Sequence, residues 1–237
     1  MQPIRAININ PSSAAWVADG RVHSDYSQGC LRHLIWKNYI PRPSTITPEL
    51  MQMGAEGEDA YQKTLETEQE WPFHKELAFK SDFEGVQRSG RVDFISYHDG
   101  FRVIHECKTS QSKNTLYKII RGHELNINHL AQLTYYLIYF EETRGKLVVR
   151  YHPKAETRIF RLKVESDGSL TVDGNPFRFD VYNQLQHQLM AAEVIKDQPK
   201  VERPVGKACL WCDYKDVCEK YDVKDVTIKQ FLEGYNG

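Results

Sequence analysis

Two strand-like runs joined by a tight-turn signal constrain the fold of this 237-residue chain more than any other feature. Residues 88–97 and 101–108 are rich in apolar and β-branched side chains, and Asp99-Gly100 lies between them. Asp-Gly between such runs is a strong signal for a β-hairpin. We therefore expect two antiparallel neighbours, so that the start of the first strand lies beside the end of the second.

Charged side chains occupy the two parts of this hairpin that are expected to meet. Asp93 lies in Gly90-Arg91-Val92-Asp93 of the first strand, and Glu106 and Lys108 lie near the end of the second. Glu106 and Lys108 are two residues apart, so they project from the same face of a strand. Carboxylate oxygens suit Mg²⁺ or Mn²⁺, and the backbone carbonyl of Cys107 can add a ligand. Such an ion activates water and stabilises charge on phosphate oxygens. Lys108 is expected beside the ion, where it can orient the water and offset phosphate charge.

The alternative for this Glu-x-Lys pattern is an ordinary ion pair on a solvated strand face. The pattern by itself arises by chance in most chains of this size. Val103 and Ile104 are both apolar, however, which indicates a strand buried on both faces at its start. The charges at its far end are then expected at the rim of a cleft.

The helix expected before the hairpin carries a further acidic candidate. Thr47 is a good N-cap and Pro48 suits the first helical position, so we expect a helix from there to about residue 69. Glu58 falls on the apolar face of this helix. A buried carboxylate needs a partner, so a metal ion is as open for Glu58 as the alternative, which is a basic side chain or a position at the edge of the helix. The other members of that face are Leu50, Gly54, Tyr61 and Leu65.

A long helix expected over about 123–143 follows the hairpin. His129, Gln132 and Tyr136 are three and four residues apart within it, so they share one face. Polar groups on an otherwise apolar helix can point into a cleft and contact a substrate. The commoner alternative is a core tyrosine with a satisfied hydroxyl beside a boundary glutamine.

Three cysteines near the C-terminus have the spacing of a metal centre. Cys209 and Cys212 form a CxxC pair and Cys218 follows, which lets three thiolates converge. Cys30 is the best candidate for a fourth ligand, whereas Cys107 is expected to be buried apolar filler. The single, distant partner cysteine favours an iron–sulfur cubane over a zinc knuckle, which stays the alternative. A bond from Cys30 would close a loop over most of the chain and stabilise the fold.

Charge and hydropathy limit where this chain acts. The formal net charge is -1, with Lys+Arg 31 against Asp+Glu 32, so nucleic-acid binding would depend on local basic patches. The N-terminal segment has no apolar run long enough for a signal peptide, and no later stretch is expected to span a membrane. A cytoplasmic protein is expected, in which thiols stay reduced.

The order of the predicted elements is typical of an α/β fold with a mixed central β-sheet flanked by helices. No clear linker divides the chain. One domain over residues 1–237 is expected, with a small accessory lobe made from about 20–45 and 200–237. The remaining predicted elements are a helix at 26–39, strands at 74–80, 145–151 and 157–164, a helix at about 177–196 and a short final helix after the cysteines.

Joined in this order, the motifs resemble the RecB-like nucleases of the PD-(D/E)xK superfamily, and more narrowly its iron–sulfur branch of CRISPR-associated Cas-four nucleases and AddB-type nuclease domains. The resemblance runs from about Tyr26 to Tyr221. One departure is Glu58, which stands where the family usually has a histidine and would favour Mg²⁺ over a softer ion. The matching segments are Cys30, Gly90 to Asp93 (GxxD), Glu106 to Ser110 ((D/E)xK-T/S), Gln132 to Tyr136 (QxxxY), and Cys209, Cys212 and Cys218.

The resemblance implies a metal-dependent DNA nuclease with a restriction-endonuclease-like core and an iron–sulfur lobe. It implies cleavage of single-stranded DNA or DNA ends, as an exonuclease with endonuclease activity left open. The setting would be recombination, repair, phage processing or CRISPR adaptation in antiviral defence, with proteins of those systems as partners; a homo-oligomer stays open. The implied residues are Asp93, Glu106 and Lys108 for catalysis, Glu58, Asp93, Glu106 and Cys107 for Mg²⁺ or Mn²⁺, Cys30, Cys209, Cys212 and Cys218 for a 4Fe–4S cluster, and Gln132 and Tyr136 for DNA.

Two other functions stay open. One is a non-catalytic DNA-binding or assembly subunit that keeps the nuclease fold, and the other is a zinc-stabilised DNA-binding module. The complete Asp/Glu/Lys set argues against the first, since a degenerate copy is expected to lose one member. Candidate DNA contacts, each more commonly a solvated surface charge, are Arg32, His33, Lys37, Lys113, Lys118 and Arg121, with Trp36 or Tyr117 to stack on bases.

Overall fold

The computed structural model divides the chain into two compact units. One comprises Met1–Pro43, Phe79–Gly90 and Tyr182–Gly237, and the other comprises Ser44–Ala78 and Arg91–Val181. In the part of the chain that the structure describes, no helix is both long and apolar enough to cross a membrane. The described residues are 31–40, 42, 47–68, 73–83, 86–111, 125, 127–177, 200–201, 209–210 and 212–235.

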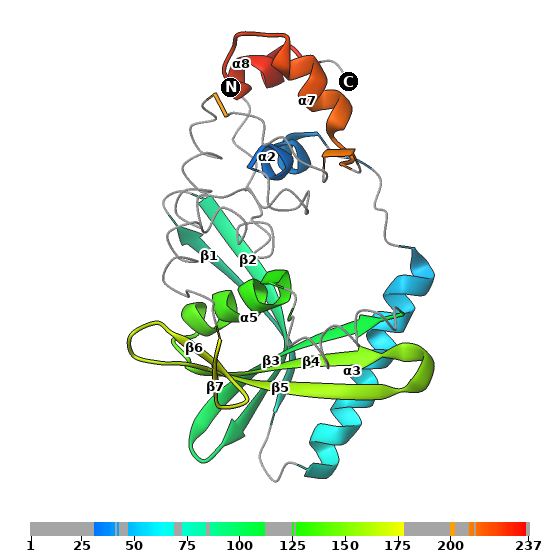
Figure 1. The fold of residues 1–237 in the computed structure, drawn as a ribbon, viewed down its shortest axis with the longest axis vertical. Helices are drawn as coiled ribbons and strands as arrows, with labels where there is room; N and C mark the ends of the chain where they lie inside the picture. The colour runs from blue at the N-terminus through cyan, green and yellow to red at the C-terminus, as the bar shows by residue number, and fades with distance from the viewer. Residues whose placement is uncertain are drawn as a thin grey trace. The chain divides into compact units, whose positions relative to one another are not determined.

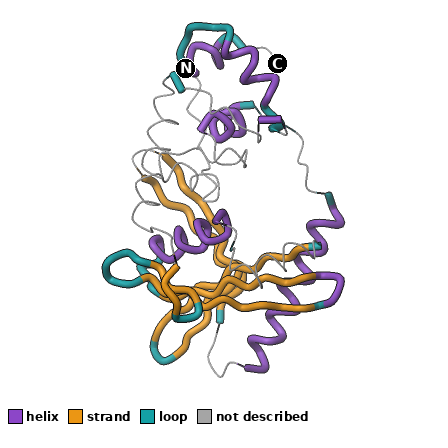
Figure 2. Tube along the Cα trace, in the orientation of Figure 1, coloured by secondary structure: helices purple, strands orange, loops and turns teal. Residues whose placement is uncertain are grey.

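One mixed sheet holds all the strands of the described residues, in the order β1-β2-β3-β4-β5-β6-β7 (Figures 1 and 2). β3 and β4 are parallel, whereas the pairs on either side of them are antiparallel. Parallel neighbours need a crossover, which α5 (Ile127–Tyr139) provides. The predicted α/β class with a mixed sheet is therefore confirmed. The strands are β1 (His74–Phe83), β2 (Val86–His98), β3 (Phe101–Ser110), β4 (Arg144–Tyr151), β5 (Glu156–Val164), β6 (Leu170–Val172) and β7 (Asn175–Phe177).

The hairpin between β2 and β3 forms at the predicted turn. Asp99 and Gly100 have φ angles of 51° and 79°, and a type I′ turn requires positive φ at both central positions. The paired register then runs from this turn to Phe94 opposite His105. The predicted antiparallel neighbours are confirmed.

A second Asp-Gly turn was missed in the sequence. Asp173 and Gly174 have φ angles of 50° and 78° and join β6 to β7, which are antiparallel neighbours. The turn signal is as strong as the first, but strands of three residues are too short to show alternation. Phe177, which was predicted to begin a helix, instead ends β7, and the rest of that predicted helix lies outside the described residues.

Helices α3 (Pro48–Glu68) and α5 pack on opposite faces of the sheet (Figure 1). On β3, His105 contacts Tyr61 of α3. Ile104 points to the other face and pairs with Gly145 of β4, where an added Cβ would lie 3.2 Å from Leu133 of α5. Consecutive residues of a strand face opposite sides, so the sheet is covered on both sides, and the burial predicted for the start of β3 is confirmed.

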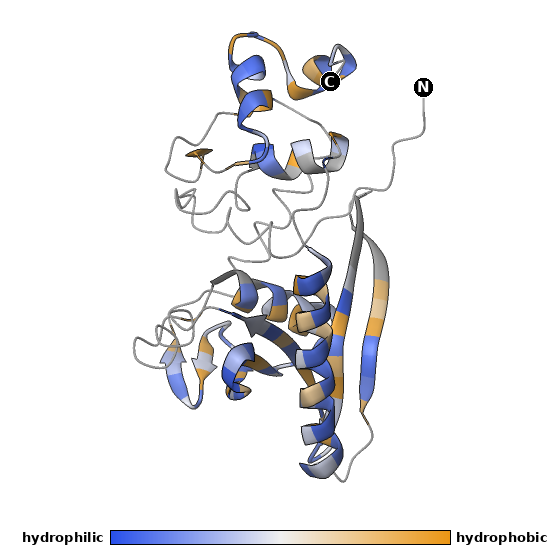
Figure 3. Ribbon diagram, turned by 90° about the vertical axis from the view of Figure 1, so that its right-hand side faces the viewer, coloured by the Kyte–Doolittle hydropathy of each residue, from blue (hydrophilic) through white to orange (hydrophobic). Residues whose placement is uncertain are grey.

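The buried stripe of α3 differs from the one predicted. It runs along Met53, Gly57, Tyr61 and Leu65, and Figure 3 shows apolar and polar residues alternating around this helix. Leu50 is 40% exposed and Glu58 is half-buried at the margin of the stripe. Tyr61 and Leu65 of the predicted face are buried, whereas Leu50 is exposed and Gly54 is only partly buried. The predicted face is therefore displaced by about one position, and Glu58 lies at the edge that the alternative allowed.

Helix α5 ends earlier than predicted. Glu141 has φ 55°, its N–H reaches the carbonyl of Ile138 at 3.2 Å, and the N–H of Glu142 reaches the carbonyl of Leu137 at 2.8 Å. These are the two hydrogen bonds of a Schellman motif. The position is usually glycine, so a glutamate there gave no stop signal in the sequence.

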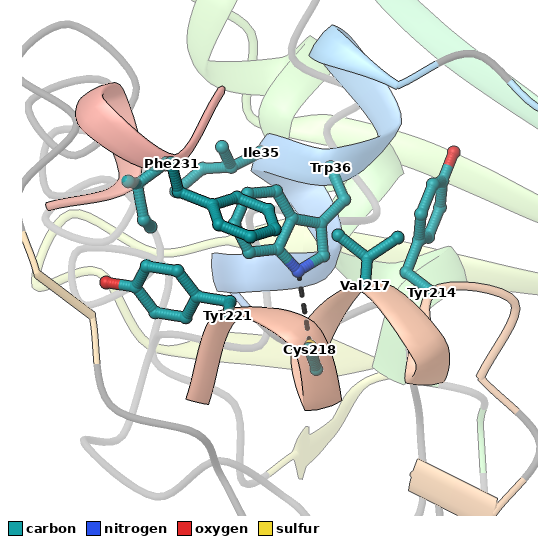
Figure 4. Close-up of a cluster of buried hydrophobic side chains, with 8 residues drawn as sticks. Ile35, Trp36, Tyr214, Val217, Cys218, Tyr221 and Phe231 are labelled. Atoms are coloured by element: carbon teal, nitrogen blue, oxygen red, sulfur yellow. Dashed lines mark hydrogen bonds between the residues drawn. The ribbon is translucent and has the colours of Figure 1, made fainter. Parts of the chain in front are cut away.

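In the other unit, α2 (Leu31–Tyr39), α7 (Lys215–Asp222) and α8 (Ile228–Glu233) share an apolar cluster (Figure 4). Trp36 is fully buried, with Tyr221 and Phe231 at ring-centroid distances of 5.6 and 5.5 Å. Such aromatic contacts add to the free energy gained by burying area. Residues 26–30, with which the first predicted helix began, lie outside the described residues.

Polar contacts add to the contacts between α2 and the C-terminal helices. The Arg32 guanidinium pairs with Asp222 and donates to the carbonyl of Val201 at 2.6 Å. The Tyr214 hydroxyl donates to the carbonyl of Ile40 at 3.0 Å. We call this assembly of α2, α7 and α8 the terminal cluster.

Candidate active site

Asp93 lies at the point where β2 leaves β3. The backbone pairing of these strands stops at Phe94 and His105, and the next amide of β3 to face β2, that of Cys107, donates to Asp93 Oδ2 at 2.7 Å. A side chain thus replaces the backbone as the partner of β3. Asp93 is only 8% exposed, and burial raises its pKa, although the amide of Cys107 opposes this.

Glu106 is fully buried beside it. Its Oε1 accepts a hydrogen bond from Lys108, but among the described residues its Oε2 has no hydrogen-bond partner. Burial raises the pKa of Glu106 to about 8, the Lys108 charge opposes the rise, and the Asp93 charge adds to it. A buried carboxylate oxygen without a partner is costly, so this atom is suited to a ligand that the chain itself does not supply.

An ordinary ion pair at the same spacing lies at the end of β5 and serves as a comparison. Lys163 Nζ donates to Glu165 at 2.6 Å, and the two side chains are 53% and 33% exposed. Exposed pairs of this kind contribute little to stability. The Glu106–Lys108 pair differs from it in burial, so the alternative of a solvated ion pair does not describe Glu106.

Glu58 approaches this pair of carboxylates from α3. Burial raises its pKa, and the next largest cause is the negative charge of Asp93, which Arg91 opposes. The helix comes close to β3 just before this residue, because a Cβ on Gly57 would lie 2.1 Å from Thr109 Oγ1. Glycine is therefore required for this approach.

The polar face of α5 lies toward the same carboxylates. Gln132 Nε2 donates to the Tyr136 hydroxyl at 3.0 Å, so these two residues share a face as predicted. Burial raises the pKa of Tyr136, and the charge of Glu106 adds to the rise. His129 has a buried Nδ1 without a partner among the described residues, and burial, aided by the Lys108 charge, lowers its pKa to about 3.

The donor chemistry fits a hard divalent cation. Three carboxylates have raised pKa values, and one of their buried oxygens has no partner among the described residues. Lys108 opposes the rise at Asp93 and Glu106, and Arg91 opposes it at Glu58. In the described ranges, no three His, Cys, Asp or Glu residues form a group that could hold a metal ion. Mg²⁺ commonly binds through one or two carboxylates and keeps several waters, so the chemistry of the pair Asp93 and Glu106 is compatible with such an ion.

Sequence reasoning missed a buried hydrogen-bonded chain next to these residues. His105 Nδ1 lies 2.8 Å from the Tyr61 hydroxyl, and its Nε2 lies 2.8 Å from Ser96 Oγ. Ser96 and His105 are fully buried. Burial also lowers the pKa of His105 to about 3, so the imidazole is neutral. The available signal was two polar residues inside otherwise apolar strands.

The described cysteines do not form a metal-holding group. Cys218 Sγ accepts the indole N–H of Trp36 at 3.2 Å, and Cys212 Sγ lies 3.5 Å from His33 Nδ1. Cys30, the predicted fourth ligand, lies outside the described residues, as do 202–208 before Cys209. Burial raises the pKa of Cys212, and the nearby Cys218 and Cys209 add to the rise.

Several predicted DNA contacts are wrong. Arg32, His33 and Trp36 are 5%, 8% and 0% exposed and pack within the terminal cluster, so they have no surface to offer a DNA strand. The physical reason is that α2 is covered by α7 and α8, which its own sequence does not reveal. The side chain of Lys37 and the whole of Lys113, Tyr117, Lys118 and Arg121 lie outside the described residues.

Four solved structures share this fold at low sequence identity. The crystal structure of SSO0001 is 15% identical, with 90% of this chain and 86% of that chain covered and a TM-score of 0.51. The alkaline exonuclease LHK-Exo from Laribacter hongkongensis is 11% identical (81% and 92% covered, TM-score 0.52), and a further LHK-Exo structure is a complex with dAMP. A phage-related exonuclease from Haemophilus somnus 129PT is 10% identical (81% and 95% covered, TM-score 0.52).

No curated protein matches the chain in sequence. The family model described as the PD-(D/E)XK nuclease superfamily matches residues 18–219. That span includes β2 and β3 with Asp93, Glu106 and Lys108, and also the polar face of α5. The chain belongs to the PD-(D/E)XK nuclease superfamily.

Proposed function

We propose that this protein is a metal-dependent DNA nuclease whose catalytic residues are Asp93, Glu106 and Lys108. The observation that carries the proposal is the buried Glu106 Oε2, which has no hydrogen-bond partner among the described residues although Asp93 and Lys108 lie beside it. A chain that buries such an atom loses stability. A buried oxygen without a partner is explained if it binds a cation in the active enzyme.

Asp93 and Glu106 would hold Mg²⁺ or Mn²⁺, with the Cys107 carbonyl and Glu58 as further contacts. When bound, the ion lowers the pKa of water and stabilises charge on the phosphate. Glu58 is half-buried, and the charge of Asp93 contributes to its raised pKa. This position suits a contact with the ion through a water molecule. Lys108 is held next to Glu106, where its ammonium group orients the attacking water and offsets phosphate charge.

Gln132 and Tyr136 are proposed to position the DNA strand. They are hydrogen-bonded to each other on the α5 face that lies toward Glu106. The fold likeness to two exonucleases, one of them also solved with dAMP, supports single-stranded DNA or DNA ends as the substrate. We propose exonuclease activity on such ends and leave endonuclease activity to the experiment.

The decisive experiment compares cleavage of end-labelled linear and circular single-stranded DNA with Mg²⁺ or Mn²⁺. Wild type should cut the linear substrate faster, and Lys108→Ala should lose cleavage. Lys163→Ala is the matched control, because it removes a lysine from an exposed Lys-x-Glu pair of the same spacing. Cleavage by Lys108→Ala at the rate of Lys163→Ala would refute the assignment.

We also propose a domain arrangement, a cofactor and a cellular process for this protein. The terminal segments, about 20–45 and 200–237, would form an accessory lobe on a single RecB-like nuclease domain over residues 1–237. A 4Fe–4S cluster on Cys30, Cys209, Cys212 and Cys218 is supported by cysteine spacing and by α2, which follows Cys30 directly and contacts Cys218 and Cys212 through Trp36 and His33. Cytoplasmic DNA recombination or repair, phage processing or CRISPR adaptation would be the process, with proteins of those systems as partners.

The cluster has its own test, independent of cleavage. Protein purified without oxygen should absorb visible light and contain iron, and Cys30→Ala should lose both together with solubility and thermal stability. Cys107→Ala is the control, because Cys107 packs in the apolar cluster between α3 and the sheet. Colourless protein with stoichiometric zinc would favour a zinc-stabilised DNA-binding module. Coloured protein without cleavage would favour the non-catalytic assembly subunit.

A further inference from the structure

The hydrogen-bonded chain of Tyr61, His105 and Ser96 joins the three elements that carry the proposed metal site. Tyr61 belongs to α3, Ser96 to β2 and His105 to β3. The two hydrogen bonds are both 2.8 Å long, and the three residues are 4%, 0% and 0% exposed. A neutral imidazole has one donor and one acceptor nitrogen, so both ring nitrogens are satisfied here.

Two members of this hydrogen-bonded chain have a carboxylate close to them in sequence. Glu106 follows His105 directly, and Glu58 precedes Tyr61 by three residues, which is about one helical turn. On the other side of Glu58, Gly57 makes the close approach to Thr109 of β3. The part of α3 that carries Glu58 is therefore fixed to β3 at two points, one a hydrogen bond and one a close steric contact.

We propose that His105 is a positioning residue of the nuclease, which locks α3 to the two carboxylate-bearing strands and thereby sets the place of Glu58. The inference rests on the proposed function, because it assigns Glu58 to the metal site. Apolar side chains of the same size would also fill this core, but their packing is non-directional. A buried hydrogen-bonded network fixes one distance and one orientation, and Mg²⁺ tolerates little departure from octahedral geometry.

The test is Tyr61→Phe, which removes one hydroxyl and leaves His105 Nδ1 without its partner. Binding of Mn²⁺ to the DNA-free protein is measured by the electron paramagnetic resonance of free Mn²⁺, and the Mn²⁺ dependence of cleavage is measured alongside. We expect affinity for Mn²⁺ to fall about tenfold, the low end of the loss when an outer hydrogen bond of a metal site is removed. Cleavage at saturating Mn²⁺ should largely recover.

Tyr221→Phe is the matched control. Tyr221 is likewise buried, at 2% exposure, and its hydroxyl donates one hydrogen bond, to the carbonyl of Val226 at 3.1 Å in the terminal cluster. Both variants should lose thermal stability, but the control should bind Mn²⁺ as wild type does. If Tyr61→Phe also keeps wild-type Mn²⁺ affinity, the chain is only structural and the inference is wrong.

A double-mutant cycle with Glu58→Gln tests whether the effect passes through Glu58. In that background, Tyr61→Phe should cause no further loss of Mn²⁺ affinity; an undiminished tenfold loss would overturn the route through Glu58. Should Tyr61→Phe fail to fold, Ser96→Ala removes the other end of the same chain and is judged by the same criteria. Wild-type protein that neither binds Mn²⁺ nor cuts DNA would refute the proposed function itself, which is a separate result.

Discussion

The terminal cluster and the carboxylate site bury their polar groups in opposite ways. In the terminal cluster, Arg32 is paired with Asp222 and with a backbone carbonyl, and the hydroxyl of Tyr221 reaches a carbonyl. At the carboxylate site, Glu106 Oε2 and His129 Nδ1 are buried without partners among the described residues. The first region behaves as a stabilising core, whereas the second keeps uncompensated polar atoms.

This difference separates stability from function. An unpartnered buried polar atom costs about 1–3 kcal/mol, and local departures from good packing rules concentrate at functional sites. Substitutions in the terminal cluster should therefore reduce the free energy of unfolding. Substitutions at the carboxylate site should reduce cleavage with much smaller effects on folding.

Asp93→Asn should cause the largest effect, a loss of cleavage of about 10⁴-fold, equivalent to about 5 kcal/mol of transition-state stabilisation. Asparagine keeps an acceptor for the Cys107 amide but lacks the charge that binds a cation. The measurement is the single-turnover cleavage rate at saturating Mn²⁺. Asp173→Asn is the control, since Asp173 also accepts a backbone N–H, from Arg161 at 2.9 Å, on an exposed turn. Equal cleavage rates in the two variants would contradict a functional role for the carboxylate site.

Trp36→Ala should destabilise the terminal cluster by about 3–5 kcal/mol, as expected for removal of a buried aromatic side chain. Trp36 is fully buried and contacts Tyr221, Phe231 and Cys218. Urea unfolding followed by circular dichroism measures the loss. Trp36→Phe should lose less, because it keeps the ring and gives up the N–H to Cys218. An unchanged unfolding midpoint for Trp36→Ala would show that the cluster does not act as a core.

Gly57→Ala should cost about 2 kcal/mol of stability, since the added methyl overpacks the contact of α3 with β3, and it should weaken Mn²⁺ binding by moving Glu58. A rotamer that turns Oγ1 away would relieve only part of this overlap, because the Thr109 Cβ would still lie 3.3 Å from the added methyl. Gly54→Ala is the control: a Cβ there meets nothing within 4 Å, so it should stabilise α3 by up to about 1 kcal/mol. Thermal melts and Mn²⁺ titrations of both variants test this prediction. Unchanged stability and unchanged Mn²⁺ binding in Gly57→Ala would contradict the close approach of α3 to β3.

A pH dependence of stability is also expected. The folded pKa of Glu106 is raised to about 8, above the roughly 4.3 of an unfolded glutamate. Its stabilising contribution is therefore complete below about pH 4.3 and is lost as the pH rises through about 8. Metal-free wild type should lose stability between these limits, with Glu58 and Asp93 acting in the same direction. In urea titrations at several pH values, Glu106→Gln should reduce the dependence of the unfolding free energy on pH. An equally steep dependence in this variant would assign the effect to other groups.

The parts of the fold that were predicted correctly are those set by local signals. Asp99-Gly100 forces a hairpin because both residues tolerate positive φ, and Thr47-Pro48 starts α3 where capping chemistry places it. The errors occur where the signal is unusual or short. Glu141 takes a position normally held by glycine, and β6 and β7 are too short to alternate.

The sequence suggested the residues of the candidate site more fully than it suggested their surroundings. Asp93, Glu106 and Lys108 were assigned from their places on a hairpin, which the register makes neighbours. Glu58 was assigned to the same face as Tyr61 with the helix edge left open, because the rotation of α3 depends on contacts of Gly57 and Tyr61 with β3 that the sequence does not show. Arg32 and Trp36 were misread as surface residues, since the helices that bury them lie far along the chain.

The sequence by itself determined the hairpin, the acidic and basic residues on it, and the order of motifs that identifies the superfamily. Those features follow from backbone preference and strand alternation, which act over a few residues. Only the tertiary structure decided that Glu106 is buried with an unpartnered oxygen and that His105 joins α3 to β2 and β3. Burial and hydrogen-bond satisfaction depend on which distant segments pack together, and no local pattern specifies that.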